Sequence, residues 1–338
     1  MDWTPKAREG GQPAVIRFLL RRLVNYVVLC FLAVLFTYVL ASLTFDPIAL
    51  LKAHKPPPPA ATIADKIHQL HLDQPIPQRF LSWFWAVLHG NFGDTVYGNA
   101  ITPDVWERAG VSFRLFLFGT IFAVVLGVLV GVSGAVRQYR FSDYLSTFVS
   151  YILIAMPVFV LGTLLKYGAT QLNYATGASF LQFTGETTPG FTGSFGAELW
   201  DRFRHIILPT IAIGLGGVAY YSRYQRNSML DVLGSDFLRT AAAKGLRRGR
   251  VLYRHGLRVA LIPMAALFTF GFATMIVGGP FTERIFGWYG MGDWLITGIA
   301  TEDTNLTATV TLFVAVCVLV SGLLADLAYA ALDPRIRI

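Results

Sequence analysis

Long apolar runs alternate with polar segments along the chain. Six of these runs have about the twenty residues that an α-helix needs to cross a bilayer. None shows the alternation of apolar and polar residues that is typical of a barrel strand, and backbone polar groups in lipid must be paired within helices or barrels. The pattern therefore predicts an all-α polytopic membrane protein. The runs lie at approximately 23–43, 115–136, 145–165, 207–221 extended by its flanks, 259–277 and 306–324.

The composition agrees with this class. Hydrophobic residues make up 54% of the 338 residues and charged residues only 14%, a balance unlike that of soluble domains. The net charge of +8 does not indicate a nucleic-acid partner, because the basic residues gather at the ends of runs and no groove-reading motif accompanies them. Cys30 and Cys317 lie inside runs, where we expect small apolar side chains without a disulfide or metal.

The arginines orient the runs. They cluster before the first run, after the second, between the fourth and fifth and after the sixth, and the positive-inside rule makes that shared side cytoplasmic. The first run is too long for the core of a signal peptide and lacks a clear cleavage site, so we expect it to be retained. Both termini are then cytoplasmic. The predicted parts are a tail at 1–16, a first membrane helix at 17–45, an external insertion at 46–110 and a core of five membrane helices at 111–338, with a cytoplasmic loop at 222–258.

The external insertion has the features of a small cap. Four prolines, Pro56 to Pro59, predict a stiff extended spacer. Thr62 and Asp65 resemble a capping box and predict the start of an amphipathic helix that Pro75 and Pro77 end. The aromatic segment after these prolines suits the lipid headgroup region.

The polar segment from Ser235 to Gly245 predicts a short helix on the cytoplasmic side. Ser235 or Asp236 can cap its first turn, and Gly245 can adopt the left-handed conformation that ends a helix. About nine residues are too few for a helix that is stable alone in water, so a partner or the rest of the fold must hold it. The residues alone leave two alternatives open, a helix that docks into another protein and a connector that lies on anionic lipid headgroups.

The sequence carries no motif for chemistry. It lacks a phosphate-binding loop, H-E-x-x-H, a nucleophile elbow and cysteine pairs at zinc spacing. We therefore predict no enzyme activity, no catalytic residue, no metal site and no cofactor bound by this chain. His68 and His71 lack a third ligand, which favours a hydrated helix surface over a metal site. For His205, at the start of run four, a hydrogen-bonding role is favoured over catalysis.

The central parts of the runs contain no ionisable residue. Arg114, Lys166, Arg223 and Asp326 lie near the ends of runs, and Asp326 is the one placed to face the bundle interior. Proton-driven carriers commonly keep such groups inside the membrane as relays, so proton coupling is disfavoured, whereas sodium coupling through backbone carbonyls stays open. We expect the energy for any transport to come from outside the bilayer.

A set of short motifs follows in order from Arg17 onward. They are Leu72–Leu81 (LDQPIPQRFL), Gly90–Gly93 (GNFG), Ser235–Leu246 (SDFLRTAAAKGL), Arg254–His255 running to Leu261–Pro263 (LIP), Glu283–Gly292 (ERIFGWYGMG) and Ala331–Arg335 (ALDPR). In this order and on these predicted sides, the motifs resemble the membrane-spanning permease subunit of binding-protein-dependent ABC importers. The branch it resembles moves dipeptides, oligopeptides and nickel complexes.

The resemblance implies a type I ABC importer permease fold with six membrane helices and an external helical insertion between the first two. It implies a multi-pass subunit of the bacterial cytoplasmic membrane, surrounded by membrane lipid and working by alternating access. Its partners would be a second, homologous permease, two ATPase subunits that bind ATP and Mg²⁺, and an extracytoplasmic substrate-binding protein. The implied cargo is a peptide, with nickel or another chelated metal or small solute as the alternative.

The resemblance also assigns residues. The family's coupling helix inserts into a cleft of the ATPase subunit, and its glycine aligns with Gly245, which places the helix at about 236–244 with Phe237 and Leu238 filling the cleft. The expected coupling residues are Asp236, Phe237, Leu238, Arg239, Thr240, Ala241, Ala242, Ala243, Lys244 and Gly245. Candidate points of flexing or close packing are Gly214, Gly216, Gly217, Gly278, Gly279 and Pro280.

The chain departs from the family pattern in a few places. Arg239 occupies the position of the family's glutamate, and Gly256 and Val259 stand where Ala and Asn are common. Tyr289 stands where a proline is common, which bears on the turn after the fifth run. Two other classes remain as alternatives, a self-sufficient secondary transporter and a structural membrane scaffold.

Overall fold

The computed structural model describes residues 11–53, 58–179, 181–264, 267–268, 271 and 279–332. The regular secondary structure of this part of the chain is helical, apart from one isolated β-bridge between Asp94 and Ala100. The longer helices are α1 (Gly11–Thr44), α5 (Thr102–Val136), α6 (Phe141–Ala155), α7 (Val158–Thr176), α8 (Phe195–Leu233) and α15 (Thr304–Leu332). The shorter helices are α2 (Ala49–Lys52), α3 (Ala60–Gln69), α4 (Ile76–Leu88), α9 (Asp236–Ala243), α10 (Arg248–Arg250), the π-helix η1 (Val251–Gly256), α11 (Leu257–Ala260), α13 (Pro280–Phe286) and α14 (Met291–Ala300).

Four described helices, α1, α5, α8 and α15, are long and apolar enough to cross a membrane. Together α6 and α7 make a fifth candidate crossing, bent by 105° at its break. These helices match five of the predicted runs. The run predicted at 259–277 lies largely outside the described residues.

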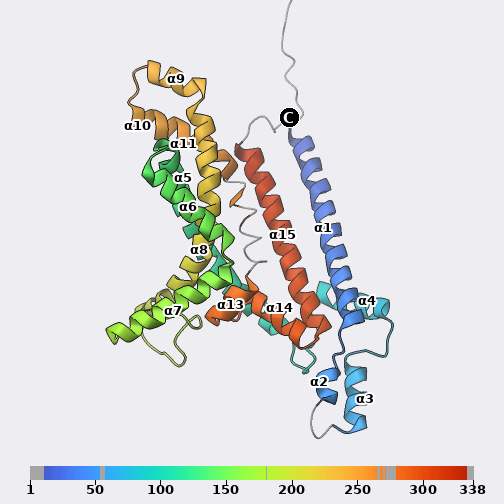
Figure 1. Ribbon diagram of the computed structural model, residues 1–338. Coiled ribbons are helices and arrows are strands. Elements are labelled where there is room, and N and C mark those ends of the chain that lie inside the picture. The colour runs from blue at the N-terminus through green and yellow to red at the C-terminus, as the bar shows by residue number, and fades with distance from the viewer. Residues whose placement is uncertain are drawn as a thin grey trace, which may run out of the picture.

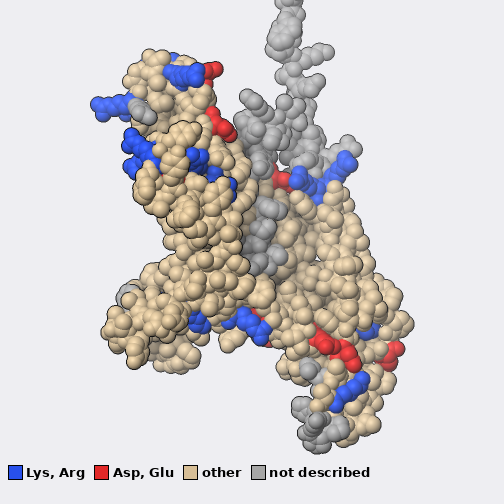
Figure 2. Space-filling view, in the orientation of Figure 1, with Lys and Arg blue, Asp and Glu red and all other residues tan. Residues whose placement is uncertain are grey.

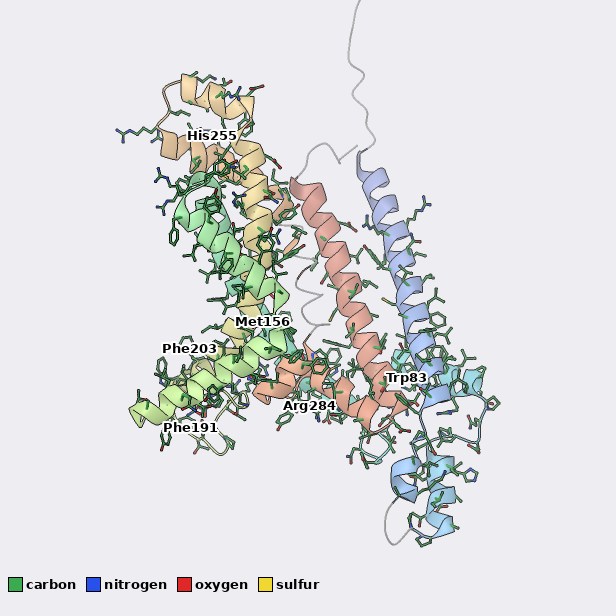
Figure 3. The ribbon with its side chains drawn as sticks, viewed as in Figure 1. Trp83, Met156, Phe191, Phe203, His255 and Arg284 are labelled. Carbon is green, nitrogen blue, oxygen red and sulfur yellow. The ribbon has the colours of Figure 1, made fainter. Side chains whose placement is uncertain are left out.

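The break between α6 and α7 corrects the straight helix predicted at 145–165. Met156, whose place Figure 3 marks, has an extended backbone and ends α6, and Pro157 opens α7. Proline lacks the N–H that a continuing helix needs, and its ring disfavours a helical conformation at the residue before it. The apolar pattern continues across the break, which is why the pattern alone did not reveal it.

The membrane helices form two packed pairs, α5 with α8 and α1 with α15, as Figure 1 shows. Glycines line the α5 side of the first pair. A Cβ on Gly127 would lie 2.6 Å from the Cβ of Tyr221, and a Cβ on Gly131 would collide with the backbone oxygen of Ser222. The two backbones can approach closely only because these side chains are absent.

The second pair is joined by an ion pair. Arg22 of α1 lies 2.6 Å from the carboxylate of Asp326 in α15. Asp326 thus faces the neighbouring helix, as the sequence suggested. Cys30 of α1 donates to the backbone oxygen of Ala315, and both Cys30 and Cys317 are free thiols.

The external insertion folds differently from its prediction. α3 begins at Ala60, before Thr62, and no side chain caps it, so the predicted capping box is wrong. Pro75 and Pro77 do not end α3, which stops at Gln69; they begin α4 instead. This follows from the fixed φ of proline, which suits the first turn of a helix. The predicted spacer at 56–59 lies partly outside the described residues.

The aromatic residues of α4 form a core with α1. Phe80 and Trp83 are buried, and the ring of Phe80 meets Phe31 and Tyr38 at centroid distances of 5.8 and 5.4 Å. Trp83, labelled in Figure 3, donates to the backbone oxygen of Phe92. The predicted place in the headgroup region therefore fits only the exposed side of α4, and the buried side attaches the insertion to the first membrane helix.

Candidate functional site: the α9 surface and its connections

The α9 helix lies at one end of the molecule, beyond the end of α8 (Figure 1). Ser235 is its N-cap residue, with an extended backbone, but neither it nor Asp236 provides a side-chain cap. The hydroxyl of Ser235 instead donates to the backbone oxygen of Val232. The predicted cap is therefore wrong. The predicted end is confirmed, because Gly245 has a φ of +79° and its N–H donates to Ala242.

One buried side chain anchors α9 to the rest of the chain. Leu238 is only 6% exposed. A Cβ on Gly256 of η1 would lie 3.4 Å from Leu238 and 3.5 Å from Met229, which places these three residues in one contact. The expectation that Leu238 fills a cleft in a partner is wrong, because its side chain is buried within this protein.

The opposite face of α9 is open to solvent. Phe237 is 44% exposed, and small side chains separate it from the basic end of the helix. Arg239 and Asp236 are 3.4 Å apart and highly exposed, so this ion pair contributes little to stability. The exposed residues are Asp236, Phe237, Arg239, Thr240, Ala242, Ala243, Lys244 and Gly245, and Ala241 is half-buried. Figure 2 shows basic side chains over this end of the molecule.

A buried ion pair lies between α9 and the membrane-spanning part of α8. Arg226 of α8 binds Asp143 of α6 through two hydrogen bonds. Asp143 also accepts from the backbone N–H of Tyr139, in the turn after α5. Gly134 of α5 lies against both charged groups, with a built Cβ 3.1 Å from Asp143. In the sequence, Arg226 was one of the arginines used to orient the membrane helices. Its ion pair with Asp143 was not predicted.

The end opposite α9 holds a buried carboxylate that the sequence analysis did not single out. Glu283 of α13 is fully buried, and its side chain accepts hydrogen bonds from the hydroxyl of Ser112 and the backbone N–H of Asp293. Burial raises its pKa to about 7. The ERIFGWYGMG motif contained this residue, and a lone Glu followed by closely spaced glycines was the signal that could have found it.

The predicted glycine sites divide into close and loose packing. A Cβ on Gly214 would collide with Phe122, and one on Gly279 would collide with Phe116. Gly216 has room, since its Cβ would lie 3.6 Å from Val158. Gly217 is buried in α8, Pro280 begins α13, and Gly278 lies outside the described residues.

The histidines have ordinary polar partners. His205 is 2% exposed, and its ring nitrogen lies 2.8 Å from the backbone oxygen of Asp201, in line with the predicted hydrogen-bonding role. His68 lies 3.2 Å from Asp73. Within the described ranges no three His, Cys, Asp or Glu residues lie close enough together to hold a metal.

Comparison with known proteins gives the family. Residues 123–338 match the family described as binding-protein-dependent transport system inner membrane component, and residues 15–113 match its N-terminal region. The oligopeptide transport system permease protein OppB of Mycobacterium tuberculosis is 49% identical over 322 residues, 95% of this chain and 99% of that protein. The dipeptide transport system permease protein DppB of Escherichia coli is 32% identical over 341 residues, 96% of this chain and 99% of that protein.

A solved structure supports the fold. A chain of the MetNI methionine ABC transporter in an inward-facing conformation superposes with a TM-score of 0.51 at 14% identity, covering 68% of this chain and 96% of that chain. This likeness agrees with the type I importer permease fold that the motifs implied. The chain belongs to the family of inner membrane components of binding-protein-dependent transport systems and is the membrane subunit, not the enzyme, of an ATP-driven importer.

Proposed function

We propose that this protein forms half of a peptide path across the cytoplasmic membrane and that α9 docks into an ATPase subunit. Membership of the family implies an ATPase and a substrate-binding protein as partners. The finer assembly we propose is two ATPase subunits, a second, homologous permease and an extracytoplasmic binding protein. We assign ATP and Mg²⁺ to the ATPase subunits and no cofactor to this chain.

The observation that carries this proposal is how α9 is attached to α8 and which of its faces is exposed. α8 is one helix of 39 residues, about 58 Å along its length, with Pro209 inside it. Only Gly234 and Ser235 separate it from α9. Leu238 anchors α9 from beneath while the face with Phe237 stays open. A small, exposed helix with one aromatic side chain suits a groove in a partner, and a force on it would act on α8.

The basic ends of the helices support an orientation with α9 and both termini in the cytoplasm. Basic side chains gather around α9 (Figure 2), and Arg22 lies in the N-terminal part of α1, whose start is at the same end of the molecule as α9 (Figure 1). The insertion with α3 and α4 is then external, on the side from which a binding protein delivers cargo. A connector lying on lipid headgroups is the competing role for α9, since its basic residues also suit anionic lipid.

Peptides are the proposed cargo because the relatives are named as oligopeptide and dipeptide permeases. Chelated nickel or another small solute is the alternative within the same family. Uptake by the reconstituted complex separates them: we expect competition by unlabelled peptides and none by chelated nickel. A self-sufficient secondary transporter would instead move substrate in vesicles that contain this chain without nucleotide.

Substitution of Gly245 tests the docking role of α9. Gly245 has open space around it but a left-handed backbone, so Gly245→Glu introduces bulk, charge and backbone strain at the end of α9 alone. We expect the variant to remain in the membrane and to lose the coupling between cargo-stimulated ATP hydrolysis and uptake. Gly249→Glu is the matched control, because Gly249 also has open space, without a positive φ. Normal coupling in Gly245→Glu contradicts the docking role.

A further inference from the structure

The first turn of α14 is capped by side chains from two other helices. Its own N-cap residue, Gly290, has no side chain to offer. The N–H of Met291 donates to the hydroxyl of Ser112 in α5 at 2.8 Å, and the N–H of Asp293 donates to Glu283 in α13 at 2.9 Å. The N–H of Gly292 also donates to Glu283. The unpaired donors of a helix start are thus satisfied in trans.

Ser112 and Glu283 are themselves joined. The hydroxyl of Ser112 donates to a carboxylate oxygen of Glu283 at 2.6 Å, so one short chain of hydrogen bonds links α5, α13 and α14. Gly290 and Gly292 allow this approach: a Cβ on Gly290 would lie 2.5 Å from the carboxylate, and one on Gly292 would lie 2.8 Å from Pro280. We call these four residues, Ser112, Glu283, Gly290 and Gly292, the α14 cap.

The carboxylate of Glu283 has no cation to balance it in the described part of the chain. On α5, Arg114 pairs with Glu186, and Arg108 lies over the ring of Trp294. From α7, Lys166 donates to the backbone oxygen of Ile285. Arg284, labelled in Figure 3, is exposed.

The acidic neighbour on α14 acts in the same direction as burial. Asp293 of α14 adds a like charge and disfavours ionisation of Glu283. On α8, Asp201 accepts hydrogen bonds from Thr188, and His205 lies against the backbone of Asp201. Among the described residues, hydrogen bonds are therefore the only interactions that favour the ionised form of Glu283. The loss of hydration on burial disfavours that form and is the larger effect.

We propose that Glu283 is a positioning residue that holds the α13–α14 segment against α5, and that release of this segment, exposing Glu283 to water, is coupled to loss of a proton. The proton-coupled release of this segment does not depend on the proposed transport function; only a part for it in the transport cycle rests on that function. The turn at 287–289 lines a cavity of about 440 Å³ together with the start of α5, residues 184–187 and Pro189. Release of the α14 cap therefore opens this cavity at the end opposite α9.

The direction of the coupling follows from the environment of the carboxyl. Burial raises the pKa of Glu283 from 4.5 to about 7, whereas water contact in the released state returns the pKa to its ordinary range. The held state therefore binds a proton more tightly than the released state. Raising the pH from 4.5 through 7 favours release.

Hydrogen exchange in the complete complex, reconstituted in lipid nanodiscs without nucleotide or cargo, tests this. We expect the protection of the backbone amides of 291–300, corrected for intrinsic exchange, to fall on the order of tenfold between pH 5.5 and pH 8. Glu283→Gln removes the titrating group and is expected to abolish this pH dependence. Glu198→Gln, at an exposed acid on α8 that does not line this cavity, is the matched control and should retain it.

The wild-type measurement decides the proposal even if Glu283→Gln fails to fold. Unchanged protection of 291–300 across this pH range in the wild type overturns it, as does equal pH dependence in a folded Glu283→Gln. Ser112→Ala is a second variant: it keeps the titrating carboxyl but removes one hydrogen-bond donor, so we expect weaker protection with the pH dependence retained. Because exchange requires no transport, these outcomes are independent of whether the cargo is a peptide or whether α9 docks.

Discussion

Arg226 of α8 holds the carboxylate of Asp143 in α6 through two parallel hydrogen bonds of 2.7 and 2.8 Å. Asp143 is 3% exposed, whereas its partner keeps some access to solvent. The pair sits between the close packing of α5 against α8 and the start of α9. Any displacement of α9 that moves the end of α8 must therefore also move the start of α6.

Removing one partner of this pair should be costly. In Asp143→Asn, Arg226 keeps its charge but loses the carboxylate, and we expect a loss of about 3 kcal/mol in the free energy of unfolding. Thermal unfolding of the purified protein measures this. Asp236→Asn is the matched control, because its ion pair with Arg239 is exposed, and we expect a change below about 0.5 kcal/mol. Similar losses in the free energy of unfolding in the two variants would contradict the claim that the Asp143 pair stabilises the fold more than an exposed ion pair does.

The closeness of α5 and α8 predicts the outcome of glycine substitutions. In Gly131→Ala the new methyl group meets backbone atoms of Ser222 and Arg226, which cannot rotate away, and we expect a destabilisation of about 2 kcal/mol from overpacking. Gly168→Ala in α7 is the matched control, since nothing lies within 4 Å of its built Cβ. There we expect a neutral or slightly stabilising effect from the better helix propensity of alanine. A tolerated Gly131→Ala in thermal unfolding argues against a rigid α5–α8 pair.

Glu283 predicts a pH dependence of stability with a defined sign. Its pKa in the folded protein is about 7, against 4.5 for an exposed carboxyl. The stabilisation from proton binding is therefore fully present below pH 4.5 and is lost as the pH rises through 7, by about 3 kcal/mol in total. Unfolding of the wild type and of Glu283→Gln, compared at several pH values, measures this. Parallel stability curves over the interval from 4.5 to 7 would contradict the assignment.

The sequence predicted the long membrane helices from their apolar pattern and the end of α9 from Gly245, because these are local properties; it did not predict the short helices α13 and α14. It did not predict the bend at Met156, since the apolar residues continue through it and only Pro157 marks it. Nor did it predict the pairing of Arg226 with Asp143 or of Glu283 with Ser112, which are 83 and 171 residues apart. Such pairings depend on which helix faces come together in the fold. The sequence around a single charged residue does not indicate which helix it will contact.

Leu238 illustrates a different limit. The apolar pair Phe237 and Leu238 suggested two side chains for a partner's cleft, but adjacent residues on a helix point about 100° apart, so both cannot face one partner equally. In the structure Leu238 is buried in the protein's own interior and Phe237 is exposed to solvent. Helix geometry applied at the level of single residues would have separated their roles.

The docking of α9 is tested most directly by photo-crosslinking in the assembled complex. A photoreactive amino acid in place of Phe237 should trap an ATPase subunit, and one in place of Tyr174, which is 88% exposed at the end of α7, should not. Trapping of lipid alone from position 237, or equal trapping of the ATPase subunit from both positions, contradicts the account.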